Sequence, residues 1–282
     1  TMVHTAAPTW FITGASSGIG LALTRAAAGR GDHVIALARR TRPLDPIVLE
    51  HSGRVVAIPA DVRRRDEVDA AVERGLEAFG RIDLVANNAG YGLFGAVEEA
   101  SDEQARQIFD TNVFGVLNVL RATLPVLRSQ GSGHIFQGSS FYGRTGHAGV
   151  GLLCATKYAV EGMTEALVAE VRPLGIEVTL VEPGPTATPF GANFDQAATI
   201  ADYDGTVRVV ARETAALPAD AYDSPDGVAR AILGAADAPE PPLRLITGSN
   251  GLALVKGSLD AQLAELEEWS ALSRTADTLV AR

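Results

Sequence analysis

Ser140, Leu153 and Lys157 form the group of residues whose types and spacing say most about chemistry. Ser140 follows an apolar run that predicts a strand, and the other two residues lie in a predicted helix over 151–173. Residues four apart share one face of a helix, so side chain 153 lies beside the Lys157 ammonium group. A tyrosine there would have its pKa lowered from about 10 and could donate or accept a proton near neutral pH. Leucine can do neither.

A glycine-rich turn lies between the first predicted strand, Thr9–Thr13, and a helix-like stretch. Glycines let the backbone approach a pyrophosphate, and the following helix N-terminus supplies free N–H groups and positive potential. The turn therefore predicts a dinucleotide site. Its cofactor-binding residues would be Gly14, Ser16, Ser17, Gly18, Ile19 and Gly20.

These segments together resemble the short-chain dehydrogenase/reductase superfamily over roughly residues 9–250. TGASSGIG resembles the superfamily's TGxxxGxG turn, and NNAG at 87–90 resembles its cofactor-side motif. Ser140 and Lys157 have the spacing of its active-site Ser and Lys, and the resemblance implies that Leu153 occupies the position of the catalytic Tyr. The string AVEEASDEQARQIFDTNVFG is similar to the 17β-hydroxysteroid-dehydrogenase-like branch.

The resemblance also implies roles for individual residues. Ser140 would bind a substrate carbonyl, Lys157 would bind the nicotinamide ribose, and Asn112 would anchor a water chain to Lys157. The adenine side would be formed by Asp61 and Val62. Further cofactor contacts would come from Asn87, Ala89, Gly90, Pro183, Gly184 and Thr188.

The end of the second predicted strand indicates which dinucleotide is preferred. NAD-binding folds of this kind place an Asp there, to bind the ribose 2′-hydroxyl. This chain has Ala38 at that position, followed by Arg39 and Arg40. A guanidinium group can bind a 2′-phosphate through two hydrogen bonds, whereas a carboxylate would repel it. We therefore expect NADP(H) to be preferred over NAD(H), although two solvated arginines would give the same sequence.

Two nearby residues are candidates to replace the missing proton donor. Tyr142 and His147 follow Ser140 by two and seven residues, and the resemblance places both along the substrate pocket, together with Tyr91 and Leu153. His147 titrates near neutrality when unperturbed. Either residue could instead only shape the cavity. If one of them has taken over the proton transfer, our hypothesis is His147.

Several functions remain open because of Leu153. The chain could be an oxidoreductase that acts on a small to medium, partly apolar carbonyl or alcohol with another proton donor. A substrate that is already a cationic iminium, or a conjugated enone, would need no phenol. Alternatively, the chain could be an inactive NADPH-binding homologue that acts as a sensor or a partner subunit. It could also be an engineered variant of an active reductase, with Leu153 as the replacement.

The order of the predicted elements defines the fold class. Strands alternate with helices, and Ser101 and Ser224 are typical helix N-caps. This alternation predicts α/β architecture: a single Rossmann-type doubly wound parallel sheet, with helices on both faces. Strands are expected at Thr9–Thr13, His33–Ala38, Val55–Pro59, Ile82–Ala86, Gly133–Gly138, Glu177–Val181 and Leu243–Ile246.

We expect residues 1–282 to form one domain that carries two additional features. Residues 189–224 are irregular and polar, and the resemblance makes them a substrate lid. Residues 251–282 form a helical C-terminal extension with an apolar stripe through Leu259, Leu263 and Trp269. That stripe is expected to cover the chain's own body, with a partner subunit as the alternative.

Composition limits the partners and the location. The chain has 282 residues, of which 46% are hydrophobic and 21% charged, which is typical of a soluble protein with a sizeable core. Its net charge of −10 argues against nucleic acid as a partner, and no apolar run is long enough for a membrane span. A single Cys, Cys154, and an N-terminus without a signal-peptide pattern favour the cytoplasm. We expect a small-molecule substrate and no metal, and the sequence leaves a homo-oligomer open as an alternative to a monomer.

Overall fold

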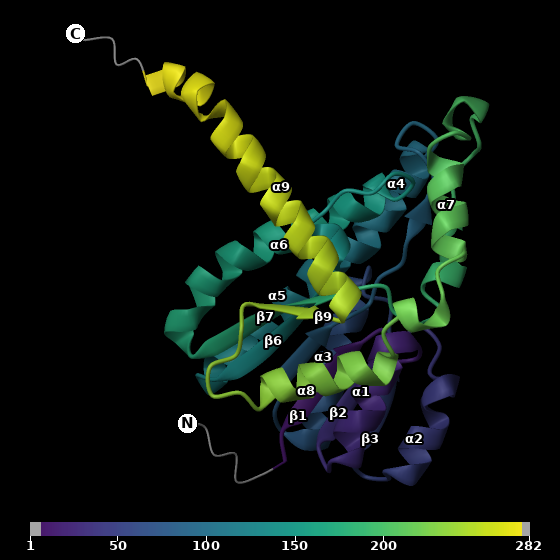
Figure 1. The fold of residues 1–282 in the computed structure, drawn as a ribbon. Coiled ribbons are helices and arrows are strands. Elements are labelled where there is room, and N and C mark those ends of the chain that lie inside the picture. Colours follow the sequence, from purple (N-terminus) through teal and green to yellow (C-terminus); the bar gives the residue numbers. More distant parts are fainter. Residues whose placement is uncertain (1–6, 278–282) are drawn as a thin grey trace.

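A seven-stranded parallel sheet forms the centre of the computed structural model, which describes residues 7–277 (Figure 1). The strand order is β3-β2-β1-β4-β6-β7-β9, so the direction of winding reverses between β1 and β4. Ligands of doubly wound sheets bind at such a reversal, outside the carboxyl ends of the strands. The strands are β1 (Thr9–Thr13), β2 (His33–Ala38), β3 (Val55–Pro59), β4 (Leu84–Asn87), β6 (Gly133–Gly138), β7 (Ile176–Pro183) and β9 (Arg244–Thr247).

The strands confirm the predicted fold class and need small corrections to their limits. The predicted strand Ile82–Ala86 begins only at Leu84 and ends at Asn87, because Ile82 and Asp83 belong to the connection between α3 and β4. The predicted strand Glu177–Val181 extends at both ends, to Ile176 and Pro183, because β6 and β9 pair with it along that length. The last strand lies one residue later than predicted. Element ends are the positions where apolar patterning is least informative.

Helices cover both faces of the sheet, and each face has its own apolar core. The helices are α1 (Gly18–Gly29), α2 (Asp45–Glu50), α3 (Arg65–Phe79), α4 (Asp102–Phe109), α5 (Gly115–Gln130), α6 (Gly151–Val171), α7 (Val207–Ala215), α8 (Pro225–Ala236) and α9 (Ser249–Ser273). On one face, α3, α5 and α6 pack against alternate sheet residues such as Phe11 and Ile135. On the other face, α1, α2 and α8 pack against Trp10 and Phe136. Because both faces are buried, the central strands are apolar along nearly their whole length.

The helix that begins at Ser101 contains a local irregularity. Ser101 and Gln104 form a reciprocal capping box at the start of α4. After Phe109 the backbone makes one π-helical turn, Asp110–Phe114, before continuing as α5. Such turns are frequent at functional sites because they displace a side chain from the regular helical track. Asn112 lies in this turn.

The segment predicted as a lid contains short ordered elements. Its strand β8 (Asp195–Gln196) pairs with β5 (Leu93–Phe94) in a small parallel ribbon. Helix α7 is fixed to the loop between β5 and α4, because Arg208 forms an ion pair with the buried carboxylate of Glu99 in that loop. That hydrogen-bonded partner lowers the pKa of Glu99 to about 2, so the pair remains ionised at neutral pH.

The apolar stripe of the C-terminal helix α9 is packed differently from the prediction. The prediction that its apolar stripe covers the chain's own body is wrong beyond the first turns. α9 leaves the body and extends away from it (Figure 1), and Leu263 and Trp269 are 59% and 54% exposed. The pattern identified a face that favours burial, but it could not specify the surface that buries it. Residues 1–6 and 278–282, at the ends of the predicted domain and its extension, lie outside the described residues.

Candidate active site

The glycine turn lies at the carboxyl end of β1, where the sheet reverses. Gly14 and Gly18 have φ angles of 64° and 51°, which favour glycine. A Cβ atom at Gly20 would overlap the carbonyl oxygen of Gly14, so the backbone itself forms a close cradle. The first turn of α1 has no acidic residue, and the side chain of its N-cap, Ser17, makes no capping hydrogen bond. This arrangement suits an anion such as a pyrophosphate.

The NNAG segment is held against this turn by hydrogen bonds. The backbone N–H groups of Asn88 and Ala89 both donate to Thr13 Oγ1, at 3.0 Å. The Asn87 side chain donates to the carbonyl of Val116 at 3.0 Å and fixes β4 to α5. The structure therefore places the two predicted cofactor segments side by side. Thr188 also reaches this place, because a Cβ atom at Gly18 would lie 3.2 Å from the Cβ of Thr188.

Basic residues gather where β2 ends. Arg39 and Arg40 are exposed there, and Arg39 is close enough for its charge to help lower the pKa of Asp61. The largest influence on that carboxyl group is the hydrogen bond from Arg63, whose ion pair with Asp61 measures 2.6 Å. Arg63 was not among the residues predicted to bind the cofactor. The run of three arginines after Val62 was the available signal.

Asn112 and Lys157 meet beside Gly90. The Asn112 side-chain oxygen accepts from the Tyr91 N–H at 3.0 Å, and its amide donates to the Tyr91 carbonyl at 2.9 Å and to Thr156 Oγ1 at 3.2 Å. A Cβ atom at Gly90 would lie 3.1 Å from Asn112 Oδ1 and 3.9 Å from Lys157 Nζ. Residues far apart in the sequence are thus brought together, and Asn112 lies near Lys157, as the family resemblance implied.

The Lys157 side chain is buried and tied to the end of β6. Its Nζ donates to the Gly138 carbonyl at 2.7 Å, and burial lowers its pKa to about 8. Glu161, one turn further along α6, opposes this shift. The ammonium form therefore predominates at neutral pH, with N–H groups left to donate to a ligand.

Ser140 lies two residues beyond Gly138, next to the end of β7. Its Oγ accepts from the Tyr142 N–H at 3.2 Å and lies 3.5 Å from the Pro183 carbonyl. The adjacent Gly184 packs against Gly251 of α9, because a Cβ atom there would lie 2.8 Å from the Gly251 nitrogen. The hydroxyl has no strong internal acceptor and is able to donate to a substrate oxygen.

Leu153 is buried in an apolar cluster. It is 1% exposed, and it packs with Leu93, Ile108, Val150 and Cys154. The aromatic rings of Tyr91 and Tyr142 pack against the same cluster. The side chain therefore forms a dry wall beside Lys157 on α6, and it offers no group that can exchange a proton.

The two candidate proton donors lie next to each other. The Tyr142 and His147 rings contact edge to face, with centroids 5.4 Å apart. Burial raises the pKa of Tyr142 to about 12, which makes its phenol a weak acid. Burial lowers the pKa of His147 from its usual value of about 6.5, so the imidazole is neutral at pH 7. Of the two residues, only His147 can exchange a proton readily near neutrality.

A buried charged network behind the site was not anticipated. Ser139 donates to Glu161 at 2.5 Å, and the Nε of Arg244 lies 3.4 Å from Glu161 and 3.5 Å from Glu182. Burial, reinforced by Glu161, raises the pKa of Glu182 to about 7. Residues 138 to 140 at the end of β6 are therefore held by two tethers to α6, through Lys157 and Glu161. These residues lie at scattered sequence positions, which gave no local signal.

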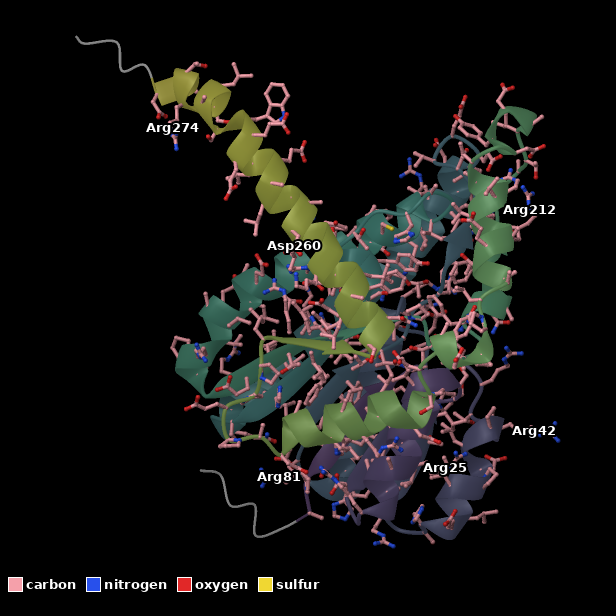
Figure 2. The ribbon with its side chains drawn as sticks, viewed as in Figure 1. Arg25, Arg42, Arg81, Arg212, Asp260 and Arg274 are labelled. Atoms are coloured by element: carbon pink, nitrogen blue, oxygen red, sulfur yellow. The ribbon has the colours of Figure 1, made fainter. Side chains whose placement is uncertain are left out.

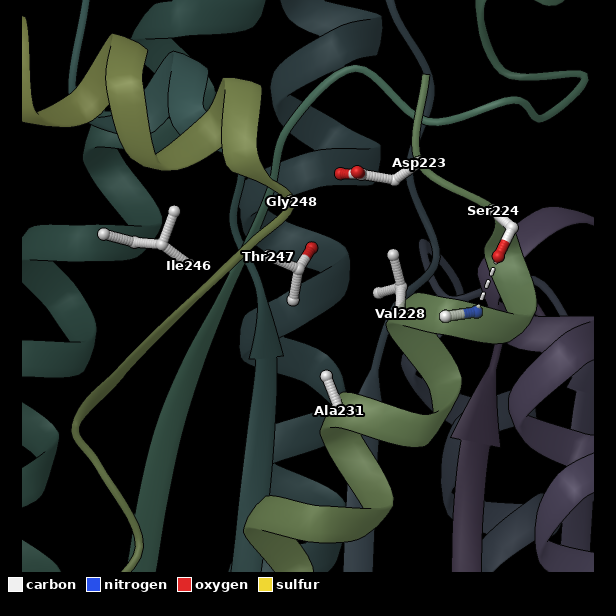
Figure 3. A pocket seen from close by; sticks show the side chains of 8 residues that line it. Asp223, Ser224, Val228, Ala231, Ile246, Thr247 and Gly248 are labelled. Atoms are coloured by element: carbon white, nitrogen blue, oxygen red, sulfur yellow. Dashed lines mark hydrogen bonds between the residues drawn. The ribbon is translucent and has the colours of Figure 1, made fainter. Parts of the chain in front are cut away.

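A hollow of about 380 Å³ lies between α8 and the end of β9 (Figure 3). Asp223, Val228, Thr247 and Gly248 are among its lining residues, and Ser224 caps α8 by accepting from the Gly227 N–H. None of the predicted catalytic residues lines it. Among residues 7–277, no group of three or more His, Cys, Asp or Glu side chains could hold a metal, and no helix there is long and apolar enough to cross a membrane.

Comparisons with known proteins define the family. Residues 8–199 match the family model described as short chain dehydrogenase. The chain is 38% identical to Oxidoreductase BOA17 of Botryotinia fuckeliana over 266 residues, which is 94% of this chain and 97% of that protein. The chain therefore belongs to the short-chain dehydrogenase family, and it is an oxidoreductase of that family. The finer placement in a 17β-hydroxysteroid-dehydrogenase-like branch stays a prediction.

Solved structures agree with this assignment. A short-chain dehydrogenase from Streptomyces avermitilis is 38% identical, with a TM-score of 0.87, and the match covers 96% of this chain and 99% of that one. A short chain dehydrogenase/reductase from Burkholderia phymatum in complex with NAD is 25% identical, with a TM-score of 0.79 and coverages of 93% and 97%. A short chain dehydrogenase from Burkholderia cenocepacia in complex with NADP is 27% identical, with a TM-score of 0.74 and the same coverages. Related structures thus bind either dinucleotide.

Proposed function

We propose that this protein is an NADP(H)-dependent oxidoreductase that acts on a small to medium, partly apolar carbonyl or alcohol, or on an iminium or enone. The observation that carries the proposal is that Asn112 and Lys157 meet at Gly90, and that Lys157 is held at Gly138, two residues before Ser140. When bound, the nicotinamide cofactor supplies or accepts a hydride. The residues Gly14 to Gly20 would hold its pyrophosphate, since the turn packs so closely that a Cβ atom at Gly20 would overlap the carbonyl oxygen of Gly14, and the backbone N–H groups of the helix N-terminus follow directly.

Arg39 and Arg40 support the preference for NADP(H). Both guanidinium groups are exposed at the end of β2, and Ala38 brings no carboxylate to that place. A 2′-phosphate there would gain charge-assisted hydrogen bonds that a 2′-hydroxyl cannot make. Arg63, although it lies nearby, is already engaged by Asp61.

Three side chains of the site have distinct tasks. The Lys157 ammonium group, which the Gly138 carbonyl holds in place, would donate to the ribose of the cofactor. Asn112 fixes the backbone of Tyr91, which borders the pocket, through two hydrogen bonds. Ser140 donates its hydroxyl to the substrate oxygen and orients the reacting carbon.

Leu153 occupies the position that the family resemblance assigns to Tyr, and it cannot donate a proton. The proton must therefore come from another residue. We propose His147 for reactions that need a proton. Because burial lowers its pKa, the neutral imidazole prevails at pH 7, where it accepts a proton from an alcohol during oxidation. Ketone reduction requires the imidazolium form, so its rate should rise as pH falls toward the pKa of His147.

Substitution of His147 with phenylalanine tests this role. Phenylalanine keeps an aromatic ring against Tyr142 but cannot exchange a proton. The variant should lose at least tenfold in turnover, within the range of about 10²–10⁴ expected for general acid–base catalysis. NADPH affinity, measured by fluorescence titration, should not change. Unchanged turnover with a normal pH profile rules His147 out.

A substrate that needs no proton is a second candidate, favoured by the dry wall around Leu153. Hydride addition to a cationic iminium carbon gives a neutral amine, so no oxyanion forms and no acid is required. An enone could be protonated later by solvent. NADPH oxidation with a cyclic iminium and with a matched ketone separates these cases, and a clear preference for the ketone counts against the second candidate.

The apolar cluster around Leu153 also favours a competing function, in which the protein binds NADPH without turning over a substrate. This alternative retains the cofactor roles of the glycine turn and Lys157 and assigns none to Ser140 or His147. It requires tight NADPH binding with no oxidation of the cofactor by any carbonyl, iminium or enone in a broad panel. Measurable turnover with one substrate removes this alternative. An engineered origin of Leu153 predicts, in addition, that tyrosine at this position restores ordinary ketone reduction.

A further inference from the structure

The outer part of α9 carries an apolar face that is exposed to solvent. Leu259, Leu263, Leu266 and Trp269 are spaced three or four residues apart, so they share one side of the helix. Leu266 is 67% exposed, whereas Val255, which precedes Leu259 by four residues, is 1% exposed. The face that packs on the body at the base of the helix therefore continues, uncovered, beyond it.

The body fixes the direction in which α9 leaves it. Gly251 packs against Gly184, and Ser258 donates its hydroxyl to the carbonyl of Arg144 at 2.8 Å. The helix is continuous from Ser249 to Ser273, so it cannot fold back over its own chain. Figure 2 shows Asp260 where the helix leaves the body and Arg274 at its far end.

The free segment is short for a helix in water. Residues 259–273 span about 22 Å at a rise of about 1.5 Å per residue. An isolated helix of this length is only marginally stable in water, because nucleation is costly and few hydrogen bonds repay it. Burial of the four apolar side chains would supply the missing stabilisation.

We propose that residues 256–273 of α9 pair antiparallel with the same segment of a second copy of this chain. In the register that centres the pair between Gln262 and Leu263, Leu259 lies opposite Leu266 of the second copy. The same contact repeats on the other side of the two-fold axis. A two-fold pair is closed, so it gives a defined dimer and leaves no free apolar edge.

Charge complementarity favours the antiparallel orientation. Lys256 and Glu267 are eleven residues apart, about three helical turns, and thus flank the apolar face on the same side. In the antiparallel register, Lys256 of each copy comes within about two residues, or 3 Å along the axis, of Glu267 of the other. In a parallel pair, the flank that carries Lys256 and Glu267 would lie on opposite sides of the interface in the two copies, so these opposite charges would not meet. Lys256 is exposed, and its partner within the helix, Asp260, competes for it only from the same chain.

The polar side of the helix argues against other surfaces. Asp260, Glu265 and Glu268 are exposed there. An anionic membrane surface would repel these carboxylates, and interfacial helices are instead rich in Lys and Arg. A second copy would bury the apolar face and would also pair Lys256 and Glu267 with opposite charges.

A cysteine cross-link reports on this pairing directly. The chain has one Cys, Cys154, which is buried and does not interfere. Leu263→Cys places a thiol near the proposed two-fold axis and should give a disulfide-linked dimer on mild oxidation. Leu272→Cys is the matched control, since Leu272 is as exposed but lies off the apolar face, and it should cross-link at least tenfold more slowly. Equal rates for the two variants would overturn the proposal.

Charge reversal tests the orientation. In the Leu263→Cys background, Lys256→Glu alone or Glu267→Lys alone places like charges together twice in each dimer and should slow cross-linking roughly threefold to tenfold. A mixture of the two reversed proteins forms a heterodimer in which both pairs are again opposite in charge. Its cross-linking rate should return to at least half that of the parent. If it does not, the antiparallel pairing is wrong. Unchanged circular dichroism and NADPH binding verify that each variant is folded.

Discussion

Leu153→Tyr is the substitution that most directly tests how the site works. Tyrosine at this position would place a phenol one helical turn before the Lys157 ammonium group. The positive charge favours the phenolate, which makes the phenol a better acid than an isolated buried tyrosine such as Tyr142. The variant should therefore gain a proton donor for ketone reduction.

The expected magnitude follows from two opposing effects. A general acid contributes about 10²–10⁴ in rate, or about 2.7–5.4 kcal/mol in the activation free energy. Leu153 is 1% exposed among Leu93, Ile108 and Val150, so a larger ring overpacks the cluster and costs about 1–3 kcal/mol of folding stability. The second effect lowers Tm without lowering the turnover of molecules that remain folded.

Leu153→Phe is the matched control, because it introduces the ring without the hydroxyl group. The kcat/KM for NADPH oxidation with a panel of ketones should be at least 100-fold higher for Leu153→Tyr than for Leu153→Phe, while the two variants should have similar Tm values. If both bind NADPH and reduce ketones equally well, position 153 is not the vacant acid position and the reasoning fails.

Three further predictions concern the cofactor and the buried charges. Arg39→Ala combined with Arg40→Ala should lower the ratio of NADPH to NADH affinity at least tenfold in fluorescence titrations, and an unchanged ratio would show that these arginines are only solvated. Because burial lowers the pKa of Lys157 to about 8, NADPH affinity should fall as pH rises from 7 to 9, and Lys157→Met should bind weakly with no such dependence. Burial raises the pKa of Glu182 to about 7 from an ordinary value of 4.5, so the folded state binds its proton more tightly and stability should fall as pH rises from 5 to 7.5. In urea unfolding, Glu182→Gln should flatten this decline. Glu161, Arg144 and Arg244 are the charged groups that face Glu182, and an identical pH dependence in the variant would assign the decline to another titrating group such as Glu161.

The sequence was most informative where one local segment carries the whole physical reason. The glycine turn is such a case, because positive φ at Gly14 and Gly18 and close backbone approach at Gly20 are encoded within seven residues. The cap at Ser101 is another, since its hydrogen-bonded partner Gln104 lies only three residues away. Parallel strands buried on both faces also show a local apolar run, so their existence was clear although some of their ends were not.

Contacts between distant segments were not predictable in the same way. The tether from Ser139 to Glu161 and the pair of Arg208 with Glu99 depend on how α6 and α7 pack. Whether the apolar stripe of α9 becomes buried depends on a second surface, which the same copy of the chain does not provide. An apolar periodicity indicates that burial is favourable, but the partner is set by three-dimensional placement. A single sequence contains no measure of that placement.

The buried Lys157 ammonium group and the Ser140 hydroxyl differ in what they indicate about function. Burial makes the Lys157 ammonium group costly in the free protein, and the Gly138 carbonyl is the acceptor that holds it, so a cofactor hydroxyl would offset part of that cost. This reasoning applies to an active enzyme and to a cofactor-binding protein alike, so Lys157 cannot distinguish them. Ser140 can, because its hydroxyl lacks a strong internal acceptor and gains one only when a substrate oxygen lies above it. The distinction between the two functions therefore depends on the substrate side of the site, where Ser140 and His147 are the groups that a reaction would use and that cofactor binding alone would not.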